Sequence, residues 1–415
     1  MTHRQLIKRV ITCQGSVQLV TALSILSYRE KEQQHLGCEY ENYLVIYDLY
    51  APSEQIDGFV ALIKKMAELI CNWRAIVYIT PTQLQDIDEE IKSLGCSKGI
   101  KTVHELIGIE AADEIYLCRN WQFGNQLLIN AYQSAQKICY GDSIGIYFSS
   151  TSKGFSVTPT TQNKHLLQRL IPRLRFLKNK FKGLIAGLNH QTECQTALSQ
   201  IEFDRGYFVL PDILGECPPM PIKTINKSLI LETLQKLKGL ADPNYIARFQ
   251  EKIAGLPVVV LLTSNLSEAG RMFQEDEITA YCQFLNAQGT YQDTLLVIKP
   301  HPRDDITKIE KLKDALANLF SKILVLSEPE LFFLPFEVFF LEAFLVGNND
   351  VKVFALSSAC ISLKLLFDVP SIVGFGDDIT SKWFYESYVT SRLIHERDLR
   401  AAVKNIEKFE FASNV

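Results

Sequence analysis

Short apolar runs alternate along the chain with segments whose apolar residues recur at helical spacing. In the first 150 residues, the apolar runs predict strands at 9–13, 43–50, 75–80, 114–118 and 137–142. The spacing of apolar residues over 54–71 and over 121–135 predicts helices between them. Strands that alternate with amphipathic helices favour a parallel sheet covered by helices.

The same alternation restarts in the second half of the chain. Here the apolar runs predict strands at 255–265, 294–305, 323–328, 351–359 and 370–378. The intervening segment 151–195 is different, because it opens rich in Thr and Ser and then becomes strongly basic. We therefore predict an α/β protein with a cleft between two domains: an N-terminal domain over 1–195 that includes the basic insertion or linker 151–195, a second domain over 196–390, and a helical segment 391–415 that packs back on the first.

Composition narrows the class of protein. The 415 residues carry 43 Lys and Arg against 47 Asp and Glu, so the net charge of −4 gives no overall positive field for nucleic acid. The ten cysteines show no CxxC pair and no spacing typical of metal ligands, which favours free thiols in a reducing cytoplasm. The longest apolar run, 331–347, contains two glutamates and is shorter than the roughly 20 residues of a membrane span. We expect a cytoplasmic protein.

The basic run from Lys164 to Lys182 has three interpretations. It contains no acidic residue and carries leucines at helical spacing. It is a solvated helix face, a contact for an acidic glycan acceptor through residues such as Arg173 and Arg175, or an interfacial helix on an anionic membrane. The third interpretation would place the protein at the periphery of the inner membrane.

Polar residues follow several predicted strands, and ligands of parallel sheets bind beyond such strand ends. In the segment 299–303, which reads KPHPR, two prolines fix the backbone on either side of His301. This histidine can donate a hydrogen bond to a phosphate or, if protonated, stabilise a departing one; alternatively it packs in a turn without a ligand. Ser357 and Ser358 precede a predicted helix, where they form an anion site or merely cap the helix.

In the first half, Asp142 lies at the end of a predicted strand, between Gly141 and Ser143. Its carboxylate either takes a proton from a substrate hydroxyl or occupies an ordinary tight turn. Other loops at the same predicted edge supply candidate acceptor-binding residues, namely Gln14, Ser16 and Asn120.

Five short motifs occur in a fixed order: YGDSIG at 140–145, LLTSNLSEAG at 261–270, KPHPR at 299–303, LPFEVFF at 334–340 and ALSSA at 355–359. In this order the chain resembles the bacterial sialyltransferases, and specifically the bacterial polysialyltransferase-like family. The resemblance covers most of the chain. His-Pro loops also occur in other two-domain transferases, including the polyol-phosphate polymerases of teichoic acid synthesis.

The resemblance implies the GT-B architecture, with two Rossmann-like domains facing a cleft, and inverting transfer of a sialic acid or related ulosonic acid from a CMP-sugar to a glycan or glycolipid hydroxyl. It implies no metal and no cofactor beyond that donor. Asp142 would be the general base, and His301 would contact the CMP phosphate. The other implied donor-binding residues are Ser357 and Ser358 on the phosphate, Glu337 on the ribose, and Ser264 and Glu268 in the donor pocket.

One departure from the family pattern concerns the acidic motif. Related motifs carry two acids or Asp-Gly, whereas Asp142 stands between Gly141 and Ser143 and is the only base in its motif. Two alternatives stay open: a CDP-polyol phosphotransferase or other nucleotide-sugar transferase, and a non-catalytic glycan-binding protein of the same fold. A degenerate binder has no need to keep both Asp142 and His301.

Overall fold

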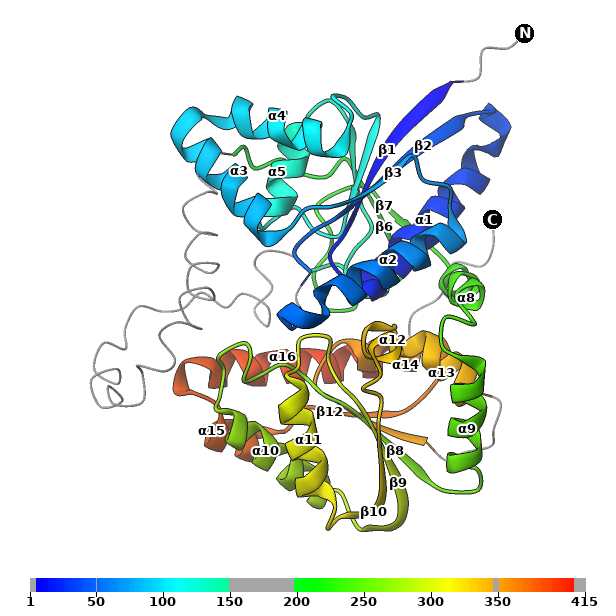
Figure 1. Cartoon of the computed structure of the whole chain (residues 1–415), viewed down its shortest axis with the longest axis vertical. Coiled ribbons are helices and arrows are strands. Elements are labelled where there is room, and N and C mark those ends of the chain that lie inside the picture. The colour runs from blue at the N-terminus through cyan, green and yellow to red at the C-terminus, as the bar shows by residue number, and fades with distance from the viewer. Residues whose placement is uncertain (1–4, 50, 149–197, 346–350, 407–415) are drawn as a thin grey trace.

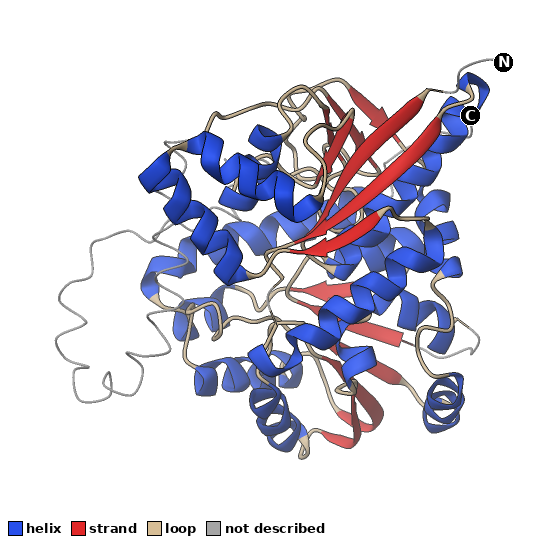
Figure 2. Ribbon diagram, turned by 45° about the horizontal axis from the view of Figure 1, so that its top comes forward, coloured by secondary structure: helices blue, strands red, loops and turns tan. Residues whose placement is uncertain are grey.

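The computed structural model describes residues 5–49, 51–148, 198–345 and 351–406. They form two lobes, each built on a parallel sheet with helices on both sides (Figures 1 and 2). The first sheet has seven strands in the order β3-β2-β1-β4-β5-β6-β7, and the second has five in the order β10-β9-β8-β11-β12. The predicted α/β class with two parallel sheets is confirmed.

The strands of the first sheet are β1 (Leu6–Cys13), β2 (Glu39–Ile46), β3 (Ala75–Tyr78), β4 (Glu114–Leu117), β5 (Gln136–Cys139), β6 (Arg205–Phe208) and β7 (Ile222–Thr224). Its helices are α1 (Ser16–Gln33), α2 (Ile56–Ile70), α3 (Pro81–Leu94), α4 (Cys96–Ile107) and α5 (Phe123–Ala131), with short 3₁₀ turns η1 (Gln34–Leu36) and η2 (Ser53–Gln55). Strand β1 is central and its second half, 9–13, is buried on both faces, which explains why the apolar residues Val10 and Ile11 follow one another instead of alternating with exposed polar residues.

The second sheet consists of β8 (Val258–Leu262), β9 (Tyr291–Lys299), β10 (Phe320–Val325), β11 (Val351–Ala355) and β12 (Ser371–Val373). Its helices are α10 (Gln274–Asn286), α11 (Ile306–Leu316), α12 (Pro329–Phe333), α13 (Phe336–Ala343), α14 (Ala359–Phe367), α15 (Asp377–Trp383) and α16 (Glu386–Asn405). Two helices, α8 (Lys227–Lys236) and α9 (Pro243–Ile253), connect the sheets. The apolar run 331–347 is largely buried in α12 and α13, as its composition indicated.

Two expected boundaries differ from the structure. Strands β6 and β7 follow residue 195 but belong to the first sheet, so the chain leaves that sheet after Thr224. We expected the segment 391–415 to pack on the first domain, but α16 packs on α14, α15 and β12 of the second sheet, and 407–415 lies outside the described residues. Both differences have a local cause: β6 and β7 are only four and three residues long, and an amphipathic helix pattern does not say which partner covers its apolar face.

The two lobes meet through apolar packing. One cluster of buried apolar residues is continuous from α1 and α2 through α8 to α13 and α14. Phe59 on α2 stacks on Phe333 at the end of α12, with ring centroids 4.5 Å apart, and the Ser16 hydroxyl donates to the Phe333 carbonyl oxygen over 2.9 Å. Since Ser16 follows β1 and α12 follows β10, the carboxyl edges of the two sheets face each other.

The register of each sheet brings its strand ends level. In the second sheet Leu262 pairs with Lys299 on one side and with Ala355 on the other. In the first sheet Leu117 pairs with Cys139, and Cys13 with Ile46. The loops that follow these residues therefore lie side by side at the edge where the lobes meet.

Two sequence-based expectations about the whole chain can be compared with the described residues. The nine cysteines in this part of the chain are all free thiols, as expected. Over the same ranges, the structure contains no helix with both the length and the apolar character needed to cross a bilayer. The basic run 164–182, with Arg173 and Arg175, lies outside the described residues.

Candidate active site

The Asp142 loop is a tight turn at the end of β5. The Asp142 amide donates to the Ile146 carbonyl over 2.8 Å, and the Gly145 amide donates back to the Asp142 carbonyl over 3.0 Å. Gly141 has a φ of +76°, and a Cβ there would lie 2.8 Å from the Ile146 carbonyl oxygen. Glycine is therefore required at 141 for the turn to close, and the turn fixes where the Asp142 carboxylate begins.

The Asp142 carboxylate is held by three donors and keeps one acceptor position. Its Oδ1 accepts from the Gln18 side-chain amide over 2.6 Å and from the Ser143 backbone amide over 2.8 Å, while Oδ2 pairs with the Arg119 guanidinium. A carboxylate offers about four lone-pair sites, so one remains on Oδ2. The Asp142 side chain is 21% exposed, so the carboxylate is not sealed from the edge of the sheet.

A second carboxylate, Asp48, lies at the same edge after β2. Its backbone has a φ of +48°, a strained region for a residue other than glycine. The Gln14 side-chain amide donates to its Oδ2 over 3.2 Å. Burial raises the pKa of Asp48, against the opposing effects of this hydrogen bond and of the nearby Arg303 and Arg119. Arg303 follows β9, so Asp48 faces a cation of the opposite lobe.

His301 is positioned by its own loop. Its backbone amide donates to the Thr263 hydroxyl over 3.0 Å and to Asp304 Oδ2 over 2.7 Å. Its ring nitrogen Nδ1 accepts from the Arg303 amide over 3.1 Å, which leaves Nε2 as the N–H donor. The half-buried ring therefore presents one hydrogen-bond donor from a fixed backbone.

The surroundings of His301 favour a neutral imidazole. Burial lowers its pKa well below the usual value, and the charges of Arg303, Lys299, Lys308 and Arg271 lower it further. The sequence left open a protonated histidine that stabilises a departing phosphate. These effects favour the neutral ring when no anion is bound, and the protonated form beside a departing phosphate stays a prediction. A neutral Nε2–H can still donate to an anion.

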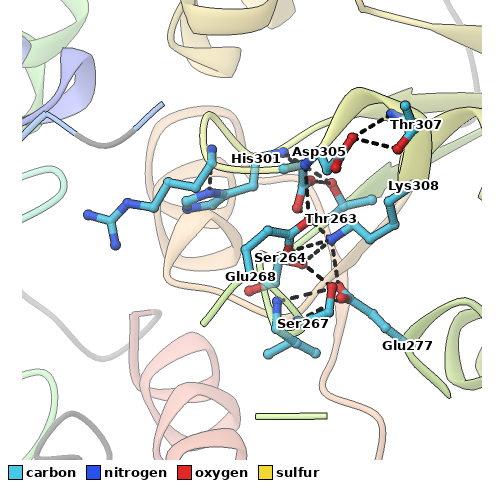
Figure 3. Close-up of polar contacts among 12 residues, drawn as sticks. Thr263, Ser264, Ser267, Glu268, Glu277, His301, Asp305, Thr307 and Lys308 are labelled. Carbon is cyan, nitrogen blue, oxygen red and sulfur yellow. Dashed lines mark hydrogen bonds and ion pairs between the residues drawn. The ribbon is translucent and has the colours of Figure 1, made fainter. Parts of the chain in front are cut away.

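A buried ionic cluster holds the His301 loop in place (Figure 3). The Lys308 ammonium lies 2.8 Å from Asp304, 2.9 Å from Glu268 and 3.1 Å from Glu277. Asp304 in turn accepts from the Thr263 hydroxyl as well as from the His301 amide. The cluster thus joins α10, α11 and the loops after β8 and β9 into one rigid unit.

The contacts of this cluster bear on two questions, whether its carboxylates could hold a metal ion and whether Glu268 lines the donor pocket. The three carboxylates are close enough together to hold a metal ion, but the Lys308 ammonium already bonds to all of them. Glu268 was expected in the donor pocket. Its carboxylate oxygens instead accept from the Lys308 ammonium, the Ser267 hydroxyl and the Asp305 amide. The structure therefore places Glu268 in the support of the His301 loop.

The remaining candidates for the donor side surround the ends of β8 and β11. Ser264 is buried, and its amide donates to the Tyr281 hydroxyl over 2.8 Å. Ser357 and Ser358 lie between β11 and α14; both are half-buried, and neither hydroxyl bonds to another described side chain. They stand at the N-terminus of α14, where free amides favour an anion.

Glu337 is buried on α13, and its contact with a ribose stays a prediction. Its carboxylate accepts from the Ser362 hydroxyl of α14, and burial raises its pKa. Lys299, at the end of β9, lies near it, and burial lowers the pKa of that lysine to about 7. The Lys299 ammonium donates to the Phe332 and Pro300 carbonyls. Lys299 therefore ties the start of the His301 loop to the end of α12.

The acceptor candidates of the first lobe are only partly brought together. Gln14 lies beside Asp48, within the same edge as Asp142. Ser16 is buried in the contact between the lobes. The Asn120 side chain donates to Glu202 and to the Ile201 carbonyl.

Sequence reasoning missed four groups of this site: Gln18, Asp48, Arg271 and Lys308. Asp48 had a signal, since it is the only acid within the apolar run 43–50. Gln18 and Lys308 had none, because their partners lie 124 and up to 40 residues away along the chain. Arg271 closes the loop that contains Ser264 and Glu268 but carries no motif of its own.

Two parallel α/β lobes, with chemistry-bearing loops on facing carboxyl edges, define the GT-B architecture of glycosyltransferases. The model of the family described as alpha-2,8-polysialyltransferase (POLYST) matches residues 9–374. The chain therefore belongs to this family, and the resemblance noted in its motifs is confirmed. It is a glycosyltransferase that uses a nucleotide-sugar donor and a glycan acceptor.

Comparison with solved structures gives remote likenesses over nearly the whole chain. The putative UDP-N-acetylglucosamine 2-epimerase of Listeria monocytogenes is 13% identical, with 98% of this chain and 92% of that chain covered and a TM-score of 0.45. The UDP-GlcNAc 2-epimerase of Neisseria meningitidis is 9% identical, with 97% and 98% covered and a TM-score of 0.45. The heptosyltransferase WaaC of E. coli is 10% identical, with 97% and 99% covered and a TM-score of 0.36. The comparison with curated proteins gave no match.

Proposed function

We propose that the protein is an inverting, metal-independent transferase that moves a sialic acid, or a related ulosonic acid, from a CMP-sugar to a glycan hydroxyl. The observation that carries the proposal is the pairing of two unlike loops on facing sheets. Asp142 offers a carboxylate with one accessible lone pair, whereas His301 offers one fixed N–H donor. Base and leaving-group contact thus belong to different lobes.

The donor would bind at the carboxyl edge of the second sheet. Its phosphate would accept from His301 Nε2–H, from the hydroxyls of Ser357 and Ser358, and from the Ala359 amide at the start of α14. Four neutral donors of this kind can stabilise negative charge on a departing phosphate without a metal ion. The buried Lys308 ammonium bonds to all three carboxylates that could otherwise hold a metal ion, which supports the same view.

The acceptor would bind at the carboxyl edge of the first sheet, near Gln14 and Asp142. The acceptor hydroxyl gives its proton to Asp142 Oδ2 while its oxygen forms a bond to the anomeric carbon of the donor. The bond from that carbon to the phosphate oxygen breaks at the same time, and CMP leaves with the electron pair. A single displacement of this kind inverts the anomeric configuration, and no side chain placed as a nucleophile is required.

A thermal-shift series with CMP, CDP, UDP and GDP tests the nucleotide directly. CMP at 100 times its Kd should stabilise the protein by about 2.7 kcal/mol, and the other nucleotides should do less. A transfer assay with CMP-sialic acid in the presence of EDTA tests the chemistry and the independence from metal. Stabilisation by UDP or GDP with no response to CMP would refute the proposal, and a response confined to CDP would favour a CDP-polyol donor.

A further inference from the structure

Arg271 is a cation beside the donor site, and the part of the chain that the structure describes gives it no counter-ion. It ends the loop that follows β8, where its amide donates to the Leu266 carbonyl over 2.9 Å and its own carbonyl accepts from the Tyr385 amide over 3.0 Å. The backbone of Arg271 is thus held by hydrogen bonds at its amide and at its carbonyl. Its side chain is half-buried, and among the described residues the guanidinium has neither a hydrogen-bond acceptor nor an acidic partner.

The charges around Arg271 are positive. Burial lowers the pKa of its guanidinium, and the nearby Arg392 and Arg303 lower it further. The two neighbours each have a carboxylate: Arg392 pairs with Glu396 over 2.7 Å, and Arg303 faces Asp48. A half-buried cation among cations is unfavourable unless an anion joins it, so this position is built to receive one.

The sheet places that anion next to the phosphate. Strand β8 lies between β9 and β11, and the three strands end level at Leu262, Lys299 and Ala355. The loop after β8 therefore begins between the loop of His301 and the loop of the two serines, and Arg271, which closes it, lies near enough to His301 to help lower the pKa of that ring. An anion held by Arg271 would belong to the same ligand as the phosphate.

We infer that Arg271 binds the sugar carboxylate of an ulosonic acid donor. The inference rests on the proposed function and extends it from the nucleotide to the sugar. A CMP-ulosonic acid carries two anionic groups, and its phosphate already has neutral donors in His301, Ser357 and Ser358. The planar guanidinium fork matches a carboxylate in two parallel hydrogen bonds, which a neutral sugar could not accept. Arg271 would thus select acidic sugars over neutral ones.

The test compares two probes on the full-length protein by calorimetric titration. The probes are CMP, which lacks the sugar, and CMP-3-fluorosialic acid, which has the carboxylate and resists transfer. Arg271→Gln should leave the Kd for CMP within about twofold and raise the Kd for the fluorinated donor about 10- to 100-fold, the range for loss of a charge-assisted bond. Arg271→Lys, which keeps the charge without the fork, should recover part of that loss.

The controls separate a failure of this inference from a failure of the proposed function. Arg248→Gln, at an exposed position on α9, removes one positive charge from the same half of the chain and should change neither Kd. An equal loss for both probes would place Arg271 on the phosphate, and no loss for either would remove it from the site; both outcomes overturn the inference. Wild-type protein that binds neither probe would overturn the proposed function, and the inference with it. If Arg271→Gln does not fold, Arg271→Lys decides the same question.

Discussion

Replacing Glu277 with Gln should stabilise the second lobe at pH 8, by an amount that shrinks as the pH falls. Glu277 is fully buried on α10 and shares one ammonium, that of Lys308, with Glu268 and Asp304. Three carboxylates thus compete for one cation. Burial raises the pKa of Glu277 from 4.5 to about 7, although Lys308 acts in the opposite direction.

The size of this gain in the free energy of unfolding follows from how the folded and the unfolded chain bind the Glu277 proton. Between pH 4.5 and about 7 the folded protein keeps a proton on Glu277 that the unfolded chain has lost. The stability contributed by this proton is therefore complete below pH 4.5 and is lost as the pH rises through 7. A pKa change from 4.5 to about 7 corresponds to about 3 kcal/mol. Gln imitates the protonated acid at every pH, so the variant should gain about this much over the wild type between pH 4.5 and pH 8.

Urea denaturation followed by tryptophan fluorescence measures the difference. Trp383 lies in the second lobe, and its indole N–H donates to Gln283 on α10 over 2.9 Å. The other two tryptophans belong to the first lobe: Trp73 precedes β3 and Trp121 follows β4. Replacing both with Phe leaves Trp383 as the fluorophore, so the signal reports on the second lobe. Glu275→Gln, at an exposed position of α10, controls for the loss of one negative charge. A difference between Glu277→Gln and wild type that stays constant from pH 4.5 to 8 would refute the reasoning.

Three further predictions concern the site and the contact between the lobes. Asp142→Asn should lower the rate of transfer by about 10²–10⁴-fold at saturating acceptor while CMP affinity is kept, with exposed Asp212→Asn as the control; near-normal transfer would place the base elsewhere. His301→Ala should weaken CMP binding in calorimetry by about tenfold or more as well as slow transfer, and unchanged CMP affinity would remove His301 from the phosphate. Phe333→Ala should lower the free energy of unfolding in urea by about 3–5 kcal/mol because its ring stacks on Phe59, and a loss below about 1 kcal/mol would contradict buried packing there.

The sequence predicted the parts of the fold that have a strong local signal. The run at 258–262 is apolar at every position, as a parallel strand buried on both faces requires, and it forms β8. The strand-end rule then placed the loops of His301, Ser357 and Asp142 correctly at sheet edges, because register follows from parallel pairing. The rule needs no knowledge of long-range contacts.

What the sequence could not predict depends on contacts between distant segments. Lys308 looks like an ordinary helix-surface lysine in the chain, and only the packing of α11 against α10 buries it among acids. The ion pair of Glu268 with Lys308 could not be predicted for the same reason, since it joins residues 40 positions apart. The tautomer of His301 likewise depends on a turn geometry that two flanking prolines favour but do not determine.

The strand order of the first sheet bears on how the chain is made. From β1 outward, its second side runs β4, β5, β6, β7 in chain order, so every new strand adds to an edge already present. Since the described chain leaves this sheet after Thr224 and builds the second from residues beyond it, the first lobe can complete its sheet on the ribosome before the second is synthesised. The apolar surface of α1 and α2 is covered by α8 and α12, which follow the first sheet in the chain and are therefore synthesised later. During that interval a nascent chain of this protein would expose the apolar face that later joins the lobes.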